Sequence, residues 1–172
     1  GLRDPSRKDK FEGEAIVFDD GFEAIAAIKR GDVKPGHVLV VRGMGPKGGP
    51  GMQGPASMVV FALYSTKLEN DVAFVSDGQL SGLCNKGLTV AEVSPEAAIG
   101  GPLGLVETGD LIKIDVDACT IDFVVGEAEL AARTAELDKA QAWIGEIRSQ
   151  VESLLGGAET RLSETTDENL FG

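Results

Sequence analysis

Cysteine and histidine are scarce in this sequence, which limits the metal chemistry that the chain can perform alone. It contains two cysteines, Cys84 and Cys119, and one histidine, His37. The cysteines lack the Cys-x-x-Cys spacing of metal sites, and two thiolates cannot complete a four-ligand site. We interpret both as reduced thiols. His37 lies between a turn and an apolar run, where we expect a surface role and not that of a catalytic base.

Positive charge is in deficit as well, with a formal net charge of −12 at pH 7. Nucleic acid is therefore not expected as a partner, because binding a phosphate backbone needs clustered Lys and Arg. A small anionic ligand remains compatible, since backbone N–H groups can hold it. No apolar run approaches the roughly 20 residues that span a bilayer, and residues 1–11 do not form a signal peptide. We expect no membrane partner and a cytoplasmic location.

Glycine is abundant, and its distribution is uneven. The chain has 23 glycines among 172 residues, about twice the usual share of ~7%. Many of them fall in two loops, 43–55 and 76–87. Hydrophobic residues make up 42%, a globular value, and a chain of this length buries roughly 70% of its unfolded surface. We expect one domain of ordinary size, with any chemistry placed on the two loops.

Strand and helix patterns alternate along the chain, which predicts a mixed α/β domain. Apolar or alternating runs predict strands at 15–18, 37–42, 72–75, 88–93, 104–106, 111–116 and 120–125. The last two are expected to pair. Both glycine-rich loops follow predicted strands, where α/β proteins commonly place their ligands.

Three helices are predicted before residue 127. The first covers 21–30, with Asp19 or Asp20 as its N-cap and Gly31 at its end, and the second covers 56–67. In the third, over 94–101, Ser94 is the expected cap and Pro95 the first helical residue.

A long amphipathic helix is predicted from Glu127 to a stop at Gly156-Gly157. Its apolar residues recur at heptad-like spacings: Leu130, Leu137, Ala140, Ile144, Ile147, Val151 and Leu154. We favour docking of this helix on its own domain over a coiled-coil contact, because coiled coils usually need three or four heptads. Residues 134–157 are thus a helical extension, 158–172 a polar tail expected to be disordered, and 1–12 a charged linker.

The two loops contain the candidate functional residues. In loop 43–55, glycines allow the backbone to approach a ligand, and successive N–H groups can form a nest for a carboxylate or phosphate. In loop 76–87, Ser81 stands among glycines without the Gly-x-Ser-x-Gly elbow of hydrolases, and the only histidine is distant in sequence. On these residues alone, a structural loop and a structural serine are the commoner interpretations.

Three motifs in fixed order resemble the C-terminal domain of the dihydroxy-acid dehydratase and phosphogluconate (sugar-acid) dehydratase family. They are RGMGPKGGPGM (42–52), SDGQLSG (76–82) and SPEAAIGGPLGLVETGDLIKID (94–115). Residues 11–42 resemble the segment that opens that domain, and 124–133 the segment that closes it. The resemblance covers about 11–133, and several separate motifs in register make it specific.

The resemblance implies an α/β fold, with a mixed β-barrel-like swivelling domain flanked by helices. It also implies a hydro-lyase that dehydrates a 2,3-dihydroxy acid, a branched-chain precursor or a sugar acid, to a 2-keto acid. In the family, an iron–sulfur cluster takes the departing hydroxyl, Mg²⁺ holds the carboxylate end, and a serine matching Ser81 removes the proton beside the carboxylate. A neighbouring cation lowers the pKa of a hydroxyl, so no histidine is required. The implied substrate-binding residues are Gly45, Pro46, Lys47, Gly48, Gly49, Gly51, Asp77, Gly78 and Gly82.

Three departures from the family pattern bear on activity. The cluster cysteines and most Mg²⁺ ligands of the family belong to an N-terminal domain that this sequence does not contain. Met44 stands where many members have a Glu ligand, and a thioether is a poor ligand for Mg²⁺. Gln79 stands where the family motif usually has Arg. We therefore expect no cofactor on this chain alone, and two hypotheses remain.

The first hypothesis is the C-terminal part of a dehydratase, inactive by itself, whose partners are its N-terminal cluster-binding domain and further copies in a homo-oligomer. The second is a non-catalytic binding or assembly domain derived from the same family. Met44 and Gln79 favour the second, whereas the intact GPKGGPGM segment and Ser81 favour the first.

Overall fold

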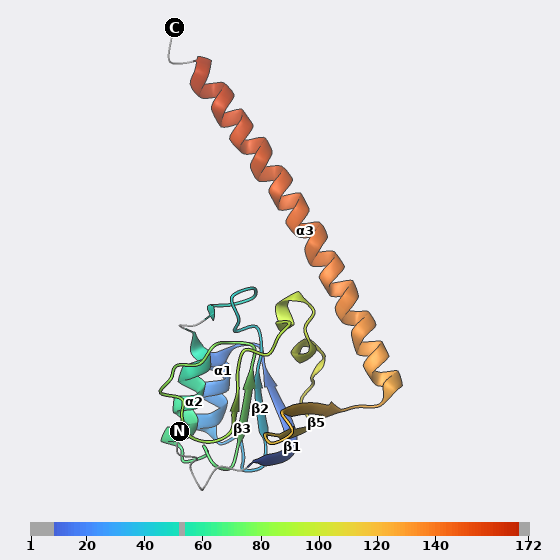
Figure 1. Cartoon of the computed structure of the whole chain (residues 1–172). Coiled ribbons are helices and arrows are strands. Elements are labelled where there is room, and N and C mark those ends of the chain that lie inside the picture. The colour runs from blue at the N-terminus through green and yellow to red at the C-terminus, as the bar shows by residue number, and fades with distance from the viewer. Residues whose placement is uncertain (1–8, 52–53, 169–172) are drawn as a thin grey trace. The chain divides into compact units, whose positions relative to one another are not determined.

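The computed structural model describes residues 9–51 and 54–168, with only the backbone described for 156–168. The chain divides into two compact units, residues 1–134 and 135–172. The first unit contains a sheet flanked by helices, and the described part of the second is a helix (Figure 1). Of the predicted linker, 1–12, residues 1–8 lie outside the described residues, and the prediction is wrong for 10–12, which belong to strand β1 (Lys10–Phe18).

Six strands form one mixed sheet in the order β4-β3-β2-β1-β5-β6. The strands are β1 (Lys10–Phe18), β2 (Val38–Val41), β3 (Ala73–Ser76), β4 (Thr89–Val90), β5 (Leu111–Asp115) and β6 (Thr120–Val124). The four strands β1 to β4 are parallel, and β5 and β6 run antiparallel to their neighbours. The predicted α/β class with a mixed, barrel-like sheet is confirmed.

Strand β1 joins the two halves of this sheet. Its residues 10–14 pair antiparallel with β5, and its residues 15–18 pair parallel with β2. The prediction of a strand at 15–18 therefore found only the second half of β1. The predicted pairing of the last two strands is confirmed, with Ile112 opposite Phe123 and Ile114 opposite Ile121.

Helices α1 (Gly21–Arg30) and α2 (Pro55–Ser65) pack against each other and cover one face of the sheet. The predicted N-cap is confirmed, because the Asp20 carboxylate accepts hydrogen bonds from the N–H groups of Phe22 and Glu23. Gly31 ends α1 in the left-handed conformation at φ 80°. The signals for this helix come from neighbouring residues in the sequence, so both of its ends could be predicted without knowledge of the tertiary structure.

Alternation along the central strands divides the core between the two faces. Leu39 and Val41 of β2 pack in the cluster under α1 and α2, while Val38 and Val40 pack in the other cluster. The second cluster also takes residues of β1, β3 and β5 and the segments after β4. All four β2 side chains are fully buried, so β2 lies between two cores.

The segment between β4 and β5 differs from the prediction. Residues 94–101 contain only a short 3₁₀ helix, η2 (Ala97–Ile99), whose N-cap is Glu96, so the roles predicted for Ser94 and Pro95 are wrong. The strand predicted at 104–106 is also wrong, because 3₁₀ helix η3 (Pro102–Leu105) occupies that place. The strand predicted over 88–93 is reduced to the two residues of β4.

Helix α3 (Glu127–Glu168) is longer than predicted. It continues through Gly156-Gly157, so the expected stop there and the disordered tail to residue 168 are wrong, and 169–172 lie outside the described residues. Glycine in a helix interior costs only about 1 kcal/mol relative to alanine, which a long helix can absorb. In the part of the chain that the structure covers, no helix is long and apolar enough to cross a lipid bilayer.

Candidate functional site

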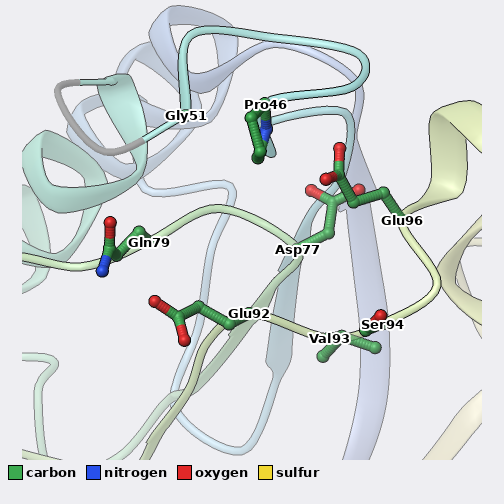
Figure 2. A pocket seen from close by; sticks show the side chains of 8 residues that line it. All are labelled: Pro46, Gly51, Asp77, Gln79, Glu92, Val93, Ser94 and Glu96. Atoms are coloured by element: carbon green, nitrogen blue, oxygen red, sulfur yellow. The ribbon is translucent and has the colours of Figure 1, made fainter.

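A cavity of about 430 Å³ lies where strands β2, β3 and β4 end. Its lining residues are Pro46, Gly51, Asp77, Gln79, Glu92, Val93, Ser94 and Glu96 (Figure 2). Three segments supply them: the loop after β2, the loop after β3 and the chain after β4. The carboxyl ends of parallel strands are the usual ligand position in α/β sheets.

Asp77 ties these three segments together. It is only 3% exposed, and its carboxylate accepts hydrogen bonds from the backbone N–H groups of Gly43 (3.0 Å), Met44 (2.8 Å) and Ala97 (3.0 Å). Charge-assisted bonds of this kind are stronger than those between neutral groups. Asp77 therefore fixes the start of the glycine loop and the start of η2 relative to the end of β3.

Glu96 makes a second tie between the same loops. Its Oε2 accepts a hydrogen bond from the Lys47 N–H at 2.8 Å, across 49 residues of sequence. A Cβ atom at Gly45 would lie 2.3 Å from the Glu96 carboxyl carbon, and one at Gly48 would lie 2.2 Å from the Cβ of Ala98. Gly48 is thus required for the close packing of residues 43–51 on 94–101, whereas a Cβ at Gly45 would displace the Glu96 side chain from its hydrogen bond to Lys47.

Two further N–H groups of the predicted nest also have partners within the chain. Gly49 donates to the Gly45 carbonyl, and Gly51, at φ 70°, donates to the Met44 carbonyl. Together with Asp77 and Glu96, these acceptors use most of the N–H groups of residues 43–51. The carboxylates that these N–H groups bind are the chain's own. Binding of a substrate carboxylate by this loop stays a prediction.

Ser81 lies beside α2, two residues beyond the cavity-lining Gln79. Its N–H donates to Ser57 Oγ at 2.9 Å, and its own Oγ accepts from the Leu83 N–H at 3.3 Å. The side chain is half-buried and is not among the cavity-lining residues. His37 directly precedes β2, whereas Ser81 follows the parallel strand β3. The two residues therefore lie at opposite ends of the strands.

The glycines on either side of Ser81 differ in their surroundings. Gly78 is buried, its N–H donates to Ser76 Oγ, and a Cβ there would lie 2.6 Å from the Cβ of Met44. Gly82 is exposed, and a Cβ there would meet no atom within 4 Å. Only the first of these two glycines is required by packing.

Met44 does not face the cavity. It is 5% exposed and packs in the core under α1 and α2. Where the resemblance implies a Glu ligand, this chain therefore has a core side chain, and the Met44 N–H donates to Asp77.

Four lining residues were missed by the sequence analysis: Glu92, Val93, Ser94 and Glu96. They follow β4, which the alternating pattern had extended to residue 93. Glu92 has a positive φ of 57°, which a sequence does not reveal and which ends the strand. Among the described residues, the cavity lining therefore carries three carboxylates and no basic side chain, a charge balance that neither glycine-rich loop indicated.

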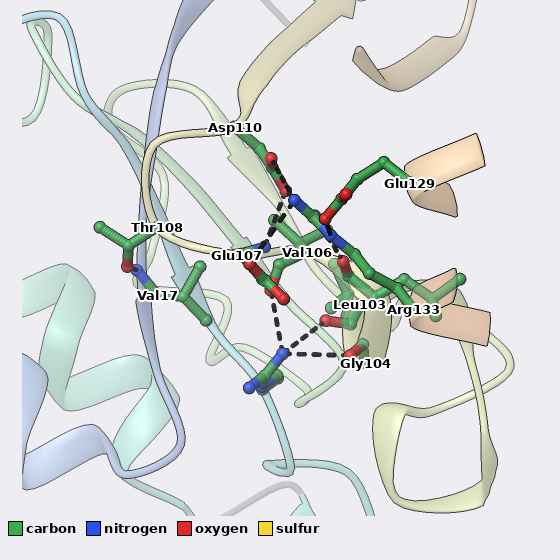
Figure 3. Close-up of polar contacts among 11 residues, drawn as sticks. Val17, Leu103, Gly104, Val106, Glu107, Thr108, Asp110, Glu129 and Arg133 are labelled. Carbon is green, nitrogen blue, oxygen red and sulfur yellow. Dashed lines mark hydrogen bonds and ion pairs between the residues drawn. The ribbon is translucent and has the colours of Figure 1, made fainter. Parts of the chain in front are cut away.

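Two arginines hold the chain that follows the cavity. Arg42 Nη1 donates to the carbonyl oxygens of Leu103, Gly104 and Val106 at 3.0–3.3 Å (Figure 3). This contact explains why 104–106 does not form a strand, since its carbonyl groups are turned toward a guanidinium.

Arg133, near the start of α3, forms a two-pronged contact with Asp110 at 2.6 and 3.2 Å and also binds the Leu105 carbonyl (Figure 3). Burial, the largest single cause, would raise the pKa of Asp110, but the hydrogen bonds from Arg133 and from the Glu107 N–H, together with the charge of Arg133, hold that pKa below its usual value. The pKa of Arg133 is raised in turn, chiefly by the hydrogen bond to Asp110. The first turns of α3 are therefore fixed to the turn before β5.

Metal ligands are not grouped in the described part of this chain. Within 9–51 and 54–155, where side chains are described, no three or more His, Cys, Asp or Glu residues are arranged to hold a metal ion. Cys84 is half-buried against the Ser57 carbonyl, and burial raises the pKa of its thiol. Cys119 is exposed and separate. These residues do not fit an iron–sulfur cluster or a Mg²⁺ site.

Comparison with known proteins identifies the family of this chain. Residues 3–158 match the family described as the dihydroxy-acid/6-phosphogluconate dehydratase C-terminal domain. The chain belongs to this family. The match extends beyond residues 11–133, where the recognised motifs lie, into helix α3.

The curated relatives are much longer than this chain. It is 52% identical to the dihydroxy-acid dehydratase of Pyrococcus abyssi over 129 residues, which cover 73% of the chain and 22% of that protein. It is 44% identical to that of Anaeromyxobacter dehalogenans strain 2CP-1 and 41% identical to that of Nitratiruptor sp., each over 163 residues, 90% of the chain and 28% of the relative. The chain thus spans about a quarter of the length of these dehydratases.

Proposed function

We propose that this chain serves as the C-terminal domain of a dehydratase that removes water from a 2,3-dihydroxy acid to give a 2-keto acid. One observation carries the proposal: the three family motifs, far apart in sequence, contribute residues to one cavity at the strand ends. Pro46 and Gly51 come from the first, Asp77 and Gln79 from the second, and the 94–96 segment from the third. Motifs that shared only a structural role would not need to meet around an open cavity.

The charge of the cavity supports a composite site, by which we mean a site shared between this chain and the N-terminal part of the dehydratase. Glu92 and Glu96 at its wall would repel an anionic substrate, because like charges at close range are unfavourable. A dihydroxy acid needs positive charge that the lining of this cavity lacks. The N-terminal part of the dehydratase would supply it, together with the iron–sulfur cluster and Mg²⁺ that the resemblance implies.

Within such a site, Ser81 would accept the proton from the carbon beside the substrate carboxylate, and the hydroxyl of the neighbouring carbon would leave with a proton as water. The loop places this residue firmly, since both its N–H and its Oγ are hydrogen-bonded. Asp77 would contribute by positioning, because its carboxylate is already engaged by three N–H groups. The glycine loop 43–51 would meet the substrate through its remaining backbone surface.

Substitution of Ser81 in the full-length dehydratase tests this proposal. Ser81→Ala should lower kcat by roughly 10²–10⁴-fold, the range typical of a general base, while costing only about 1 kcal/mol of stability. The matched control is Ser65→Ala, which removes the same hydroxyl from an exposed position at the end of α2, outside the cavity lining, and should leave kcat within a few-fold of wild type. Steady-state kinetics and metal content of all three proteins decide the matter. Turnover of Ser81→Ala near wild type, with metal content unchanged, would reject the serine as the base.

Met44 favours a second candidate, a non-catalytic binding or assembly domain. Its side chain fills the core where the family often has a metal ligand, so the change has been accommodated by packing. Substrate-dependent keto acid formation by the full-length protein would reject this candidate, and its absence in a metal-loaded, folded protein would support it.

A further inference from the structure

Helix α3 carries apolar side chains that nothing within its own unit covers. The described part of residues 135–172 is one helix, so its side chains have no second element of that unit to pack on. Ile144, Ile147, Val151 and Leu154 are 43%, 39%, 47% and 70% exposed. Exposed large apolar residues in a row indicate an interaction surface.

The spacing of these residues is that of a coiled-coil seam. We call the strip formed by Leu137, Ala140, Ile144, Ile147, Val151 and Leu154 the α3 seam; its spacings alternate regularly between three and four residues. This mean period of 3.5 residues keeps a seam facing another helix, whereas a helix docked on a globular surface usually shows a wider apolar face with a 3.6-residue period. The helix also continues past Gly156-Gly157, so the seam is not at a frayed end.

We propose that the α3 seam pairs with the seam of a second copy of this chain in a parallel two-stranded coiled coil. Leu137, Ile144 and Val151 occupy the a positions, and Ala140, Ile147 and Leu154 the d positions. Ile144 and Val151 at a positions with Leu154 at a d position match the pattern that favours two strands, whereas Leu137 at a and Ile147 at d depart from it. A second copy offers the same strip in the same register, so the contact is self-complementary and closes as a dimer.

The size of the apolar surface fits a weak dimer. A large apolar side chain removes about 60–120 Å² from water when it is fully buried. Seven such side chains are available on each helix: Leu137, Trp143, Ile144, Ile147, Val151, Leu154 and Leu155. Together they offer roughly 400–800 Å² per copy, against about 800 Å² per partner in a standard interface. The seam covers about two and a half heptads, fewer than the three or four that a coiled coil usually needs, so we expect a weak, reversible dimer that forms as the chain is concentrated.

Residues beside the seam support the same arrangement. Trp143 and Leu155 occupy g and e positions and are 63% and 61% exposed, so they widen the apolar contact. The outer f positions carry the small residues Ala142 and Ser149. These two positions provide a matched site for control substitutions on the opposite face of the same helix.

Sedimentation velocity of the 172-residue chain over a dilution series tests the proposal. The wild type should change from 17.9 kDa toward twice that mass as its concentration rises. Ile144→Glu combined with Ile147→Glu should stay at the monomer mass throughout, because it buries two like charges per helix in the seam. Ala142→Glu with Ser149→Glu adds the same charge to the outer face and should dimerise as wild type does.

A milder variant separates loss of the seam from loss of the helix. Ile144→Ala with Ile147→Ala introduces alanine, the strongest helix former. This variant should weaken the dimer at least tenfold without lowering helicity in circular dichroism. A wild type that stays monomeric at all concentrations would overturn the proposal, and this includes the case in which the seam packs on the chain's own first unit. A seam variant that dimerises as tightly as wild type would also overturn it.

The parallel orientation has its own test. Leu154→Cys in a Cys84→Ser, Cys119→Ser background places two thiols opposite each other in a parallel pair, whereas in an antiparallel pair each lies near residue 137 of the partner. Mild oxidation should therefore give a covalent dimer on a non-reducing gel, and Ser149→Cys in the same background should give far less. Failure of the first variant to cross-link would overturn the parallel arrangement.

Discussion

Asp77 has little exposed surface and a carboxylate that is fully used by the backbone. One oxygen accepts from Met44, and the other accepts from both Gly43 and Ala97. An amide of the same shape has one acceptor oxygen and one donor nitrogen, so it must leave at least one of these N–H groups without a partner. The residue thus acts on the position of two loops, and any effect of its loss on chemistry passes through them.

We predict that Asp77→Asn lowers the free energy of unfolding by about 1–3 kcal/mol, the cost of leaving a buried donor unsatisfied. Urea denaturation of the 172-residue chain measures this difference. Glu92→Gln is the control, because Glu92 is an exposed carboxylate on the same cavity and its change should stay within about 0.5 kcal/mol. Equal midpoints for wild type and Asp77→Asn would contradict the role assigned to this carboxylate.

The glycine loop 43–51 and the segment 94–101 form one packed element, although they are distant in sequence. Two ties, from Asp77 and Glu96, and two glycine contacts hold them together. Glycine in this loop is needed for approach to other parts of the chain, and its presence alone does not indicate a ligand. The same glycines can still present their outer surface to the cavity.

Gly48→Ala tests this packing. The added Cβ would lie 2.2 Å from the Cβ of Ala98, so the two segments must separate, and overpacking of this kind typically costs about 1–3 kcal/mol. Gly82→Ala adds the same atom where nothing lies within 4 Å and should leave stability nearly unchanged. Thermal unfolding of both variants checks the difference. A Gly48→Ala protein as stable as Gly82→Ala would show that residues 43–51 do not need close contact with 94–101.

Local signals determined which elements the sequence could predict. Asp20 and Gly31 cap α1 through neighbours a few residues away, so the helix was found with both its ends. The region from Ser94 to Val106 was missed because its conformation depends on two remote side chains, Asp77 and Arg42. Of the predicted binding residues, Pro46, Gly51 and Asp77 line the cavity. Glu92 and Glu96 were not predicted, because they follow a two-residue strand that the sequence pattern extended to residue 93.

Under the proposed function, the molecule as a whole supplies one part of a site that the N-terminal part of the dehydratase completes. It spans about a quarter of the dehydratases it resembles, and its described residues contain no group of metal ligands. We predict that the purified 172-residue chain, after anaerobic incubation with iron and sulfide, binds no stoichiometric iron and shows no dehydratase turnover. Metal analysis and keto acid detection measure this, with a full-length dehydratase as the positive control. An iron-containing chain with a visible absorption band would contradict the composite site.

Strand β1 carries a consequence for how this sequence can change in length. Its first five residues are in register with β5 and its last four with β2, and Gly13 leaves no room for a Cβ beside the Gly36 carbonyl. An insertion or deletion of one residue near Glu14 would turn one half of the strand over relative to the other, because successive side chains point to opposite faces. Phe11 or Ala15 would then lose its place in the core. Length variation should therefore be tolerated in the turns around the sheet and rejected in β1.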